Sequence, residues 1–221
     1  KPKSSAHYQR EFRKRLREQG LVKKEVWILP EHAKRLAVYE KILRERDPSN
    51  FKVGDSQTGV SVMTANVIGK EVTNWTTTSL YEALKGADLF VNGQAKVELI
   101  DGVEPALHIV MAEYGDLPIF LTVSGEQIIV EAVLWSIDEV SNVAAFNDAI
   151  LRTHKYFPLS TISLDRVGDE GDYYHMFGAL SSTSILSNVV FEIEVLASNV
   201  IQATEAYGEF LSATVVETVN S

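Results

Sequence analysis

The apolar residues between positions 185 and 211 constrain the fold more than any other feature of this sequence. They recur at steps of three and four, which is the pattern of one face of a long helix. One sheet face rarely covers so wide a stripe, so the sequence predicts a second covering surface, most simply another subunit. The stripe consists of Val189, Ile193, Leu196, Val200, Ala203, Tyr207 and Phe210, widened by Val190, Ala197, Ile201 and Leu211.

The chain before this helix alternates between strand and helix patterns. β-rich runs are expected at 96–100, 107–113, 119–124 and 127–135, with turn signals such as Asp101-Gly102 between them. A helix is expected at 143–156, and two more strands at 161–167 and 173–180. The pattern Ser79 to Glu82 predicts a capping box that opens a helix reaching about Phe90. Residues 78–221 are therefore predicted to form an acidic α+β domain, an antiparallel sheet flanked by helices.

Residues 1–47 are predicted to form a small helix–strand–helix module. Tyr8, Phe12 and Leu16 make one apolar stripe on the first helix, and Gly20 is well placed to end it. A strand is expected at Val22–Leu29, and a second helix after Pro30. Since a single strand cannot satisfy its own edges, we expect the module to pair with a second copy. Residues 48–77 are rich in Gly, Ser, Thr and Asn, and are predicted to be a linker.

The net charge of −9 conceals a division of the chain into a basic and an acidic part. Residues 1–47 hold 14 Lys and Arg against 7 Asp and Glu, a net of +7, and the remaining residues carry −16. Such asymmetry often marks a region that binds a polyanion or an acidic partner. The candidate polyanion contacts are Arg10, Arg13, Lys14, Arg15, Arg17, Lys23 and Lys24.

Three roles for the basic module remain open: DNA binding, insertion of its first helix into an anionic membrane surface, and docking to a partner or a second copy. Neither face of the expected strand is a row of Arg, Asn or Gln, which favours docking. The residues predicted to dock are Phe12, Leu16, Val26, Trp27 and Ile28 of the module, with Val189, Ile193, Leu196, Val200 and Tyr207 of the last helix.

The sequence offers no positive sign of catalysis, a cofactor or a metal. The chain has no cysteine, and its five histidines stand in no paired metal signature. Phosphate-loop, dinucleotide and nucleophile-elbow motifs are absent. The cluster Asp165, Asp169, Glu170 and Asp172 is better explained as a solvated turn than as a calcium loop. We therefore expect a protein that is not an enzyme.

The expected location is the cytoplasm. No apolar run approaches the roughly 20 residues that cross a bilayer, and the charged N-terminus lacks a signal-peptide core.

The stretches Leu107–Leu121, Leu151–Ser160 and Val189–Leu196 resemble the YjfI-like family of bacterial proteins. The resemblance covers Ser79 to about Leu211 and implies a fold like that of type III secretion chaperones and YbjN proteins. Those domains dimerise and bind polypeptide partners without catalysis. Family members are commonly encoded beside PspA-like, ESCRT-III-like membrane-remodelling proteins. The resemblance thus implies an adaptor or regulator in an envelope-stress system, at or near the inner membrane, with a PspA-like partner.

The segment Arg10–Leu21 followed by Val26–Pro30 resembles the N-terminal module of MazE-like and ribbon–helix–helix antitoxins. This second resemblance implies dimerisation through the strand, and DNA binding as an alternative function.

Overall fold

The computed structural model describes residues 3–23, 26, 36 and 74–212. The chain divides into two compact units, Lys1–Arg15 with Val72–Ser221, and Leu16–Glu71. The predicted boundaries differ from this division, because the first part of the N-terminal helix belongs to the same unit as the predicted main domain. All the strands of the described residues belong to this first unit.

A six-stranded antiparallel sheet in the order β1-β2-β3-β4-β6-β5 forms the centre of the unit. Neighbours in sequence are mostly neighbours in the sheet, and only β6 is inserted between β4 and β5. The predicted α+β class, an antiparallel sheet flanked by helices, is confirmed. The strands are β1 Ala95–Ile100, β2 Ala106–Met111, β3 Leu117–Ser124, β4 Gln127–Ser136, β5 Thr161–Val167 and β6 Gly171–Ser181.

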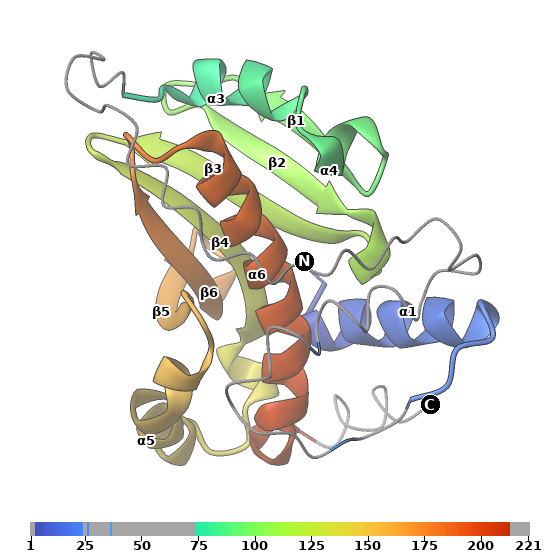
Figure 1. Cartoon of the computed structure of the whole chain (residues 1–221). Coiled ribbons are helices and arrows are strands. Elements are labelled where there is room, and N and C mark those ends of the chain that lie inside the picture. Colours follow the sequence, from blue (N-terminus) through green and yellow to red (C-terminus); the bar gives the residue numbers. More distant parts are fainter. Residues whose placement is uncertain (1–2, 24–25, 27–35, 37–73, 213–221) are drawn as a thin grey trace. The chain divides into compact units, whose positions relative to one another are not determined.

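Alternate residues of the central strands point into the core. In β2, Leu107, Ile109 and Met111 are buried while the residues between them are half-buried. The same alternation runs through β3 and β4, as expected for strands with one packed face. The long helix α6 (Leu186–Ala206) lies along this packed face, with α3 (Thr77–Leu84) and α4 (Asp88–Val91) on the same side (Figure 1).

Helix α5 (Val143–Thr153) closes one end of the core, which is aromatic. The ring of Phe146 packs edge-on against those of Trp135, Tyr174 and Tyr207, at centroid distances of 5.7, 4.8 and 5.4 Å. Two hydroxyl contacts fix α5: Tyr174 donates to Asn147, and Tyr207 lies 2.8 Å from the hydroxyl of Thr153.

Among the described helices, none is long and apolar enough to cross a membrane.

The first helix of the domain begins earlier than predicted. Thr76, not Ser79, is the N-cap of α3, and Ser79 is the third helical residue of the capping box. Both residues carry the hydroxyl that the motif needs, so composition alone could not choose between them. Glu82, the expected partner of Ser79, instead pairs with Lys85 at 3.0 Å. The helix also ends at Leu84, and α4 forms separately after Gly86.

The wide stripe of α6 has an intramolecular explanation, which corrects the prediction of a second subunit there. The sheet covers one part of the stripe, and α3 and the N-terminal helix α1 (Ser5–Glu18) contact the rest. The five residues of this region that were predicted to dock, four in α6 and Tyr207 directly after it, are at most 4% exposed, so they build this chain's own core and are not available to a partner. They are Val189, Ile193, Leu196, Val200 and Tyr207.

Only the first helix of the predicted N-terminal module is described in full. It ends at Glu18, and Gly20 follows with a left-handed φ of 81°, as predicted for its terminator. Within the expected strand, Val22, Lys23 and Val26 are described and are not in a strand. Lys24, Trp27 and Ile28 lie outside the described residues, as does most of the second helix and of the linker.

One carboxyl group is buried in the packed face. Glu192 of α6 is 1% exposed and lies against Gly178 of β6, where only a residue without a Cβ fits. Its Oε1 atom has no hydrogen-bond partner. Burial without compensation disfavours the ionised form and raises the pKa of Glu192 to about 7.

We predict that Glu192→Gln stabilises the protein increasingly as the pH rises from 5 to 8. The folded state holds the Glu192 proton with a pKa of about 7, against an ordinary value of 4.5. Wild-type stability from this group is therefore fully present below pH 4.5 and is lost as the pH passes 7, by up to about 3 kcal/mol. Urea unfolding at several pH values measures the difference between wild type and variant.

The matched control is Glu194→Gln, two residues along the same helix at a partly exposed position. Because Glu194 is not sealed in the core, this control should not reproduce the stabilisation expected of Glu192→Gln. Parallel pH profiles for wild type and Glu192→Gln would contradict the burial of an uncompensated carboxyl.

Candidate functional site

Helix α1 lies against α6, from which it is separated by almost the whole chain. Gln9 is fully buried and donates from its side-chain nitrogen to the backbone oxygen of Ile201, at 3.1 Å. The hydroxyl of Thr204 donates to that of Ser5, at 2.9 Å. Ala6 and Tyr8 are buried beside these contacts. Both of these hydrogen bonds are buried away from water. They therefore hold α1 against α6 and also define its position there.

The other side of α1 rests on the turn between β2 and β3. The ring of Phe12 stacks on Tyr114 at a centroid distance of 5.5 Å, with the two planes 10° apart. Gly115, with a φ of 76°, comes so close that a Cβ there would lie 2.7 Å from the backbone oxygen of Tyr8. Phe12, which was predicted to dock, therefore docks within its own chain.

The predicted polyanion contacts on α1 and directly after it divide into a half-buried group and an exposed group. Arg13 pairs with Glu205 at 3.4 Å, and Arg15 pairs with Asp116 at 2.6 Å while donating to the backbone oxygen of Ala112. Arg10 lies 3.4 Å from a ring nitrogen of His7. In the second group, Lys14, Arg17 and Lys23 are exposed. Some of the basic face thus meets the acidic body of its own chain.

The remaining predicted docking residues of the N-terminal module are solvent-accessible to different degrees. Leu16 is half-buried, and Val26 is exposed.

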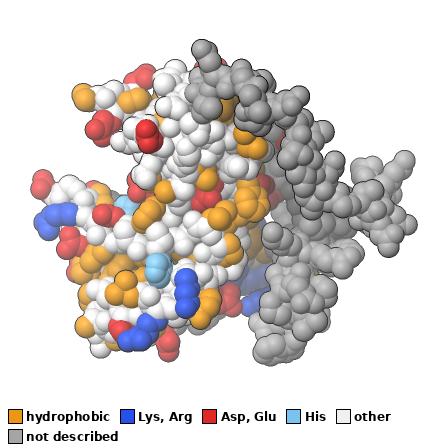
Figure 2. Space-filling view, turned by 60° about the vertical axis from the view of Figure 1, so that its left-hand side comes forward, with side chains coloured by type: hydrophobic (Ala, Val, Ile, Leu, Met, Phe, Trp, Pro, Cys, Tyr) orange, Lys and Arg blue, Asp and Glu red, His pale blue; other side chains and the backbone are white. Residues whose placement is uncertain are grey.

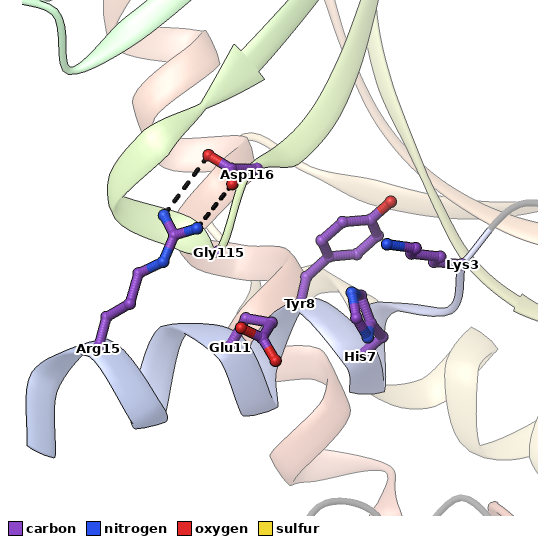
Figure 3. Close-up of a pocket in the computed structure, with 7 residues that line it drawn as sticks. All are labelled: Lys3, His7, Tyr8, Glu11, Arg15, Gly115 and Asp116. Atoms are coloured by element: carbon purple, nitrogen blue, oxygen red, sulfur yellow. Dashed lines mark hydrogen bonds and ion pairs between the residues drawn. The ribbon is translucent and has the colours of Figure 1, made fainter. Parts of the chain in front are cut away.

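A surface hollow of about 410 Å³ lies where α1 meets the β2–β3 turn (Figure 3). Lys3, His7, Glu11 and the Arg15–Asp116 pair line it, so charges of both signs alternate around it. Burial, and then the nearby cations Lys3 and Arg10, lower the pKa of His7, which is neutral at pH 7. The hollow is therefore close to electrically balanced, and it suits no single charged ligand.

The second candidate surface is the side of the sheet opposite α6, here called the open face. It is formed by the half-buried residues of the alternating strands, and none of its apolar members belongs to the buried core. Antiparallel sheets with one uncovered side usually carry polar residues there. Here the apolar members are numerous: Val110, Pro118, Phe120, Ile129, Val133 and Phe177.

The strand register aligns one row of side chains straight across the open face. Glu98 of β1 pairs with His108 of β2, and His108 pairs with Phe120 of β3. Phe120 in turn pairs with Glu131 of β4, which pairs with Phe177 of β6. The rings of His108 and Phe120 stack at 5.2 Å. The row thus contains two carboxylates and three rings, with the stacked pair of His108 and Phe120 between Glu98 and Glu131.

A second histidine lies beside this row. His175 of β6 approaches Glu131 to 3.7 Å, and His108 approaches Glu98 to 4.0 Å. Each carboxylate of the row thus has an imidazole neighbour from the adjacent strand. The surface can offer apolar and aromatic contact together with acceptors for cationic groups.

Sequence reasoning did not find the open face. Each strand's alternation was visible, but the row exists only once the register brings five strands into line. In the sequence the five histidines stand in no paired metal signature, and nothing pairs His108 and His175 with Glu98 and Glu131.

Comparison with known proteins identifies the family. Residues 74–211 match the family described as "Uncharacterized protein conserved in bacteria (DUF2170)". This chain belongs to that family. The protein YjfI of Escherichia coli strain K12 is 37% identical over 107 residues, which are 48% of this chain and 80% of YjfI. YjfI of Escherichia coli O157:H7 matches equally. The predicted YjfI-like assignment is confirmed.

Two solved structures are similar in part. YbjN from E. coli, described as a proposed transcription regulator, has a TM-score of 0.41 and 17% identity over 56% of this chain and 90% of its own. A protein from Methanothermobacter thermautotrophicus has a TM-score of 0.44 and 13% identity, over 60% of this chain and 99% of its own. The match of the N-terminal module to antitoxins stays a prediction.

We predict that Gly115→Ala detaches α1 from the domain. Alanine at this left-handed position costs about 1 kcal/mol in backbone strain, and its Cβ would also collide with the backbone of Tyr8 and the side chain of Glu11. Backbone amides of residues 5–18 should then exchange with solvent at least tenfold faster, measured by hydrogen exchange and mass spectrometry.

Gly125→Ala is the matched control. Gly125 also has a left-handed φ, of 60°, but open space surrounds the position that a Cβ would occupy. It should suffer only the backbone cost and leave exchange in α1 unchanged. If the two variants give the same exchange in α1, the docking of α1 on the β2–β3 turn is wrong.

Proposed function

We propose that this protein is a non-enzymatic adaptor that binds a protein partner on the open face of its sheet. The observation that carries the proposal is the row of rings and carboxylates across β1, β2, β3, β4 and β6, set among apolar side chains. Apolar surface that a protein keeps outside its core typically marks a site of interaction.

The chemistry of the row defines the segment that fits. Phe120 and Phe177 offer the large aromatic contact areas that dominate binding energy at interfaces. Glu98 and Glu131 offer charge partners for Lys or Arg, whose stems pack on neighbouring rings. The expected partner segment is therefore amphipathic, with apolar residues on one side and flanking basic residues.

The role of α1 in this proposal is structural. Arg13 and Arg15 already meet carboxylates of the same chain, and a polyanion would have to displace those partners. DNA or anionic lipid binding by α1 is therefore the less favoured function. If present, it would weaken steeply with salt, since phosphate contacts release counterions.

The family resemblance supplies the first partner to test, a PspA-like protein. In such a system the adaptor would act at the inner membrane in envelope stress. This finer assignment rests on the resemblance, and the open-face proposal does not depend on it.

We predict that a photo-crosslinking phenylalanine analogue at position 120 captures a partner in bacterial cells. The captured protein would be identified by mass spectrometry and purified. Its affinity, and that of a PspA-like protein, would then be measured for wild type and Phe120→Lys. Loss of a central aromatic contact should weaken binding of the captured protein at least tenfold.

Position 191 is the matched control, because Phe191 is an exposed phenylalanine on α6, on the side of the unit opposite the open face. The analogue at 191 should not capture the same protein, and Phe191→Lys should leave affinity unchanged. Equal capture from both positions, or unchanged affinity of a folded Phe120→Lys protein, would refute binding at the open face. Sequence-specific DNA binding that persists at physiological salt would instead favour a transcriptional regulator.

A further inference from the structure

The outer edge of β5 offers the backbone groups of a whole strand to a partner. β5 is the last strand of the sheet, and among the described residues it pairs with β6 alone. Its pairing with β6 is regular from Thr161 to Val167, without a bulge. Natural edges are usually blunted by Pro, Lys, a bulge or a covering element. β5 has no Pro, Lys or bulge, and its exposed charged residues are Asp165 and Arg166.

The opposite edge of the sheet differs in what contacts it. β1 also carries one exposed basic and one exposed acidic residue, Lys96 and Glu98, but both α3 and α4 contact it. The two edges of the sheet are therefore not equivalent, and β5 is the one prepared for pairing.

Exposed apolar side chains lie on β5 and on the elements that directly precede it. They come from α5, from the short 3-10 helix η5 (His154–Tyr156) and from the loop and strand after it, and hydrophobic side chains gather on this side in Figure 2. A hydrogen bond between His154 and Thr161 holds η5 against the start of β5. The exposed residues are Leu151 (76%), Tyr156 (73%), Leu159 (59%) and Leu164 (42%).

The charges near β5 differ between its two ends. Four carboxylates, here called the acidic turn, lie in the last part of β5, in the turn after it and at the start of β6, against the single guanidinium of Arg166. They are those of Asp165, Asp169, Glu170 and Asp172. The opposite end of the strand lies beside η5, which contributes Lys155 and His154.

This difference in charge between the two ends of β5 favours a second copy of the chain as the partner. If the β5 strands of two copies lie antiparallel, the acidic turn of each copy meets the Lys155 end of the other, twice about one two-fold axis. A parallel arrangement would place acidic turn against acidic turn. Leu164 is the middle residue of β5, so it would lie at the axis opposite its own copy.

We propose that the β5 edge is a homodimer interface, in which two copies pair their β5 strands antiparallel and join two six-stranded sheets into one. An isologous contact of this kind uses the same surface on both subunits. It buries the apolar side chains around Leu164 and satisfies the edge hydrogen bonds. The dimer contact would leave the open face accessible. The proposed dimer therefore does not depend on the proposed partner site.

The first test is the mass of the full-length protein in solution. At tens of micromolar, light scattering should give twice the chain mass of 24.6 kDa for wild type. Leu164→Lys places an ammonium group at the axis and should give a folded monomer that still melts cooperatively, without the concentration dependence of the wild-type melting temperature. Val103→Lys, on the exposed β1–β2 connection, is the control for the added charge and should stay dimeric.

The second test reports the pairing itself and needs no monomeric variant. The chain has no cysteine, so a single introduced cysteine is unique. Directly opposite residues of antiparallel strands lie about 4.5–5.5 Å apart at Cα, within the range of a disulfide. Oxidation should cross-link Leu164→Cys most efficiently, Ile162→Cys and Arg166→Cys less, and Val103→Cys not at all.

A wild-type monomer at tens of micromolar overturns the proposal. So does a dimer that survives Leu164→Lys and does not cross-link through β5, because its interface then lies elsewhere.

Discussion

The packing of α6 along one face of the sheet is the interaction on which the rest of this structure depends. Its buried stripe fills the layer between helix and sheet, and α3, α5 and α1 are placed against it or its end. The buried apolar core of the described residues therefore lies on one side of the sheet. This close packing leaves one polar group incompletely satisfied. The carboxyl group of Glu192 lies over Gly178, and one of its oxygens has no hydrogen-bond partner.

A sheet covered on one side has three other surfaces, namely its open face and its two edges. In this chain they differ in chemistry. The open face aligns His108 and Phe120 with carboxylates on either side, whereas the β5 edge combines free backbone groups with a charge gradient along the strand. The first suits a foreign amphipathic segment and the second suits a copy of itself. We thus propose two separate interactions for one fold.

The regular elements were predictable because local pattern decides them. β5 has the bounds that its alternation and flanking turns indicated, and α5 begins at Val143 as expected. The start of α3 was not predictable to the residue, since Thr76 and Ser79 both offer a capping hydroxyl. The width of the apolar stripe on α6 predicted a second covering surface but did not say which one. Part of that surface is a helix of the same chain, α1, which begins at Ser5.

The candidate surfaces needed information that a single sequence does not carry. Gln9 and Ile201 are far apart along the chain, so no local spacing predicts their contact. The open face is a product of register, because a shift of one residue in β3 would turn Phe120 into the core. Charge alone predicted a polyanion or an acidic partner for the basic residues of α1, and Arg13 and Arg15 meet carboxylates of the same chain. Charge could not say which carboxylates they meet.

The central claim is that the side of the sheet opposite α6 is accessible in the free protein. Hydroxyl-radical footprinting of the purified full chain measures this directly, since oxidation of a phenylalanine ring follows its exposure to solvent. We expect Phe120 and Phe177 to be oxidised several times faster than Phe146, which is fully buried in the aromatic core. Oxidation of Phe120 and Phe177 as slow as that of Phe146 would show that the open face is already covered, and would contradict the claim.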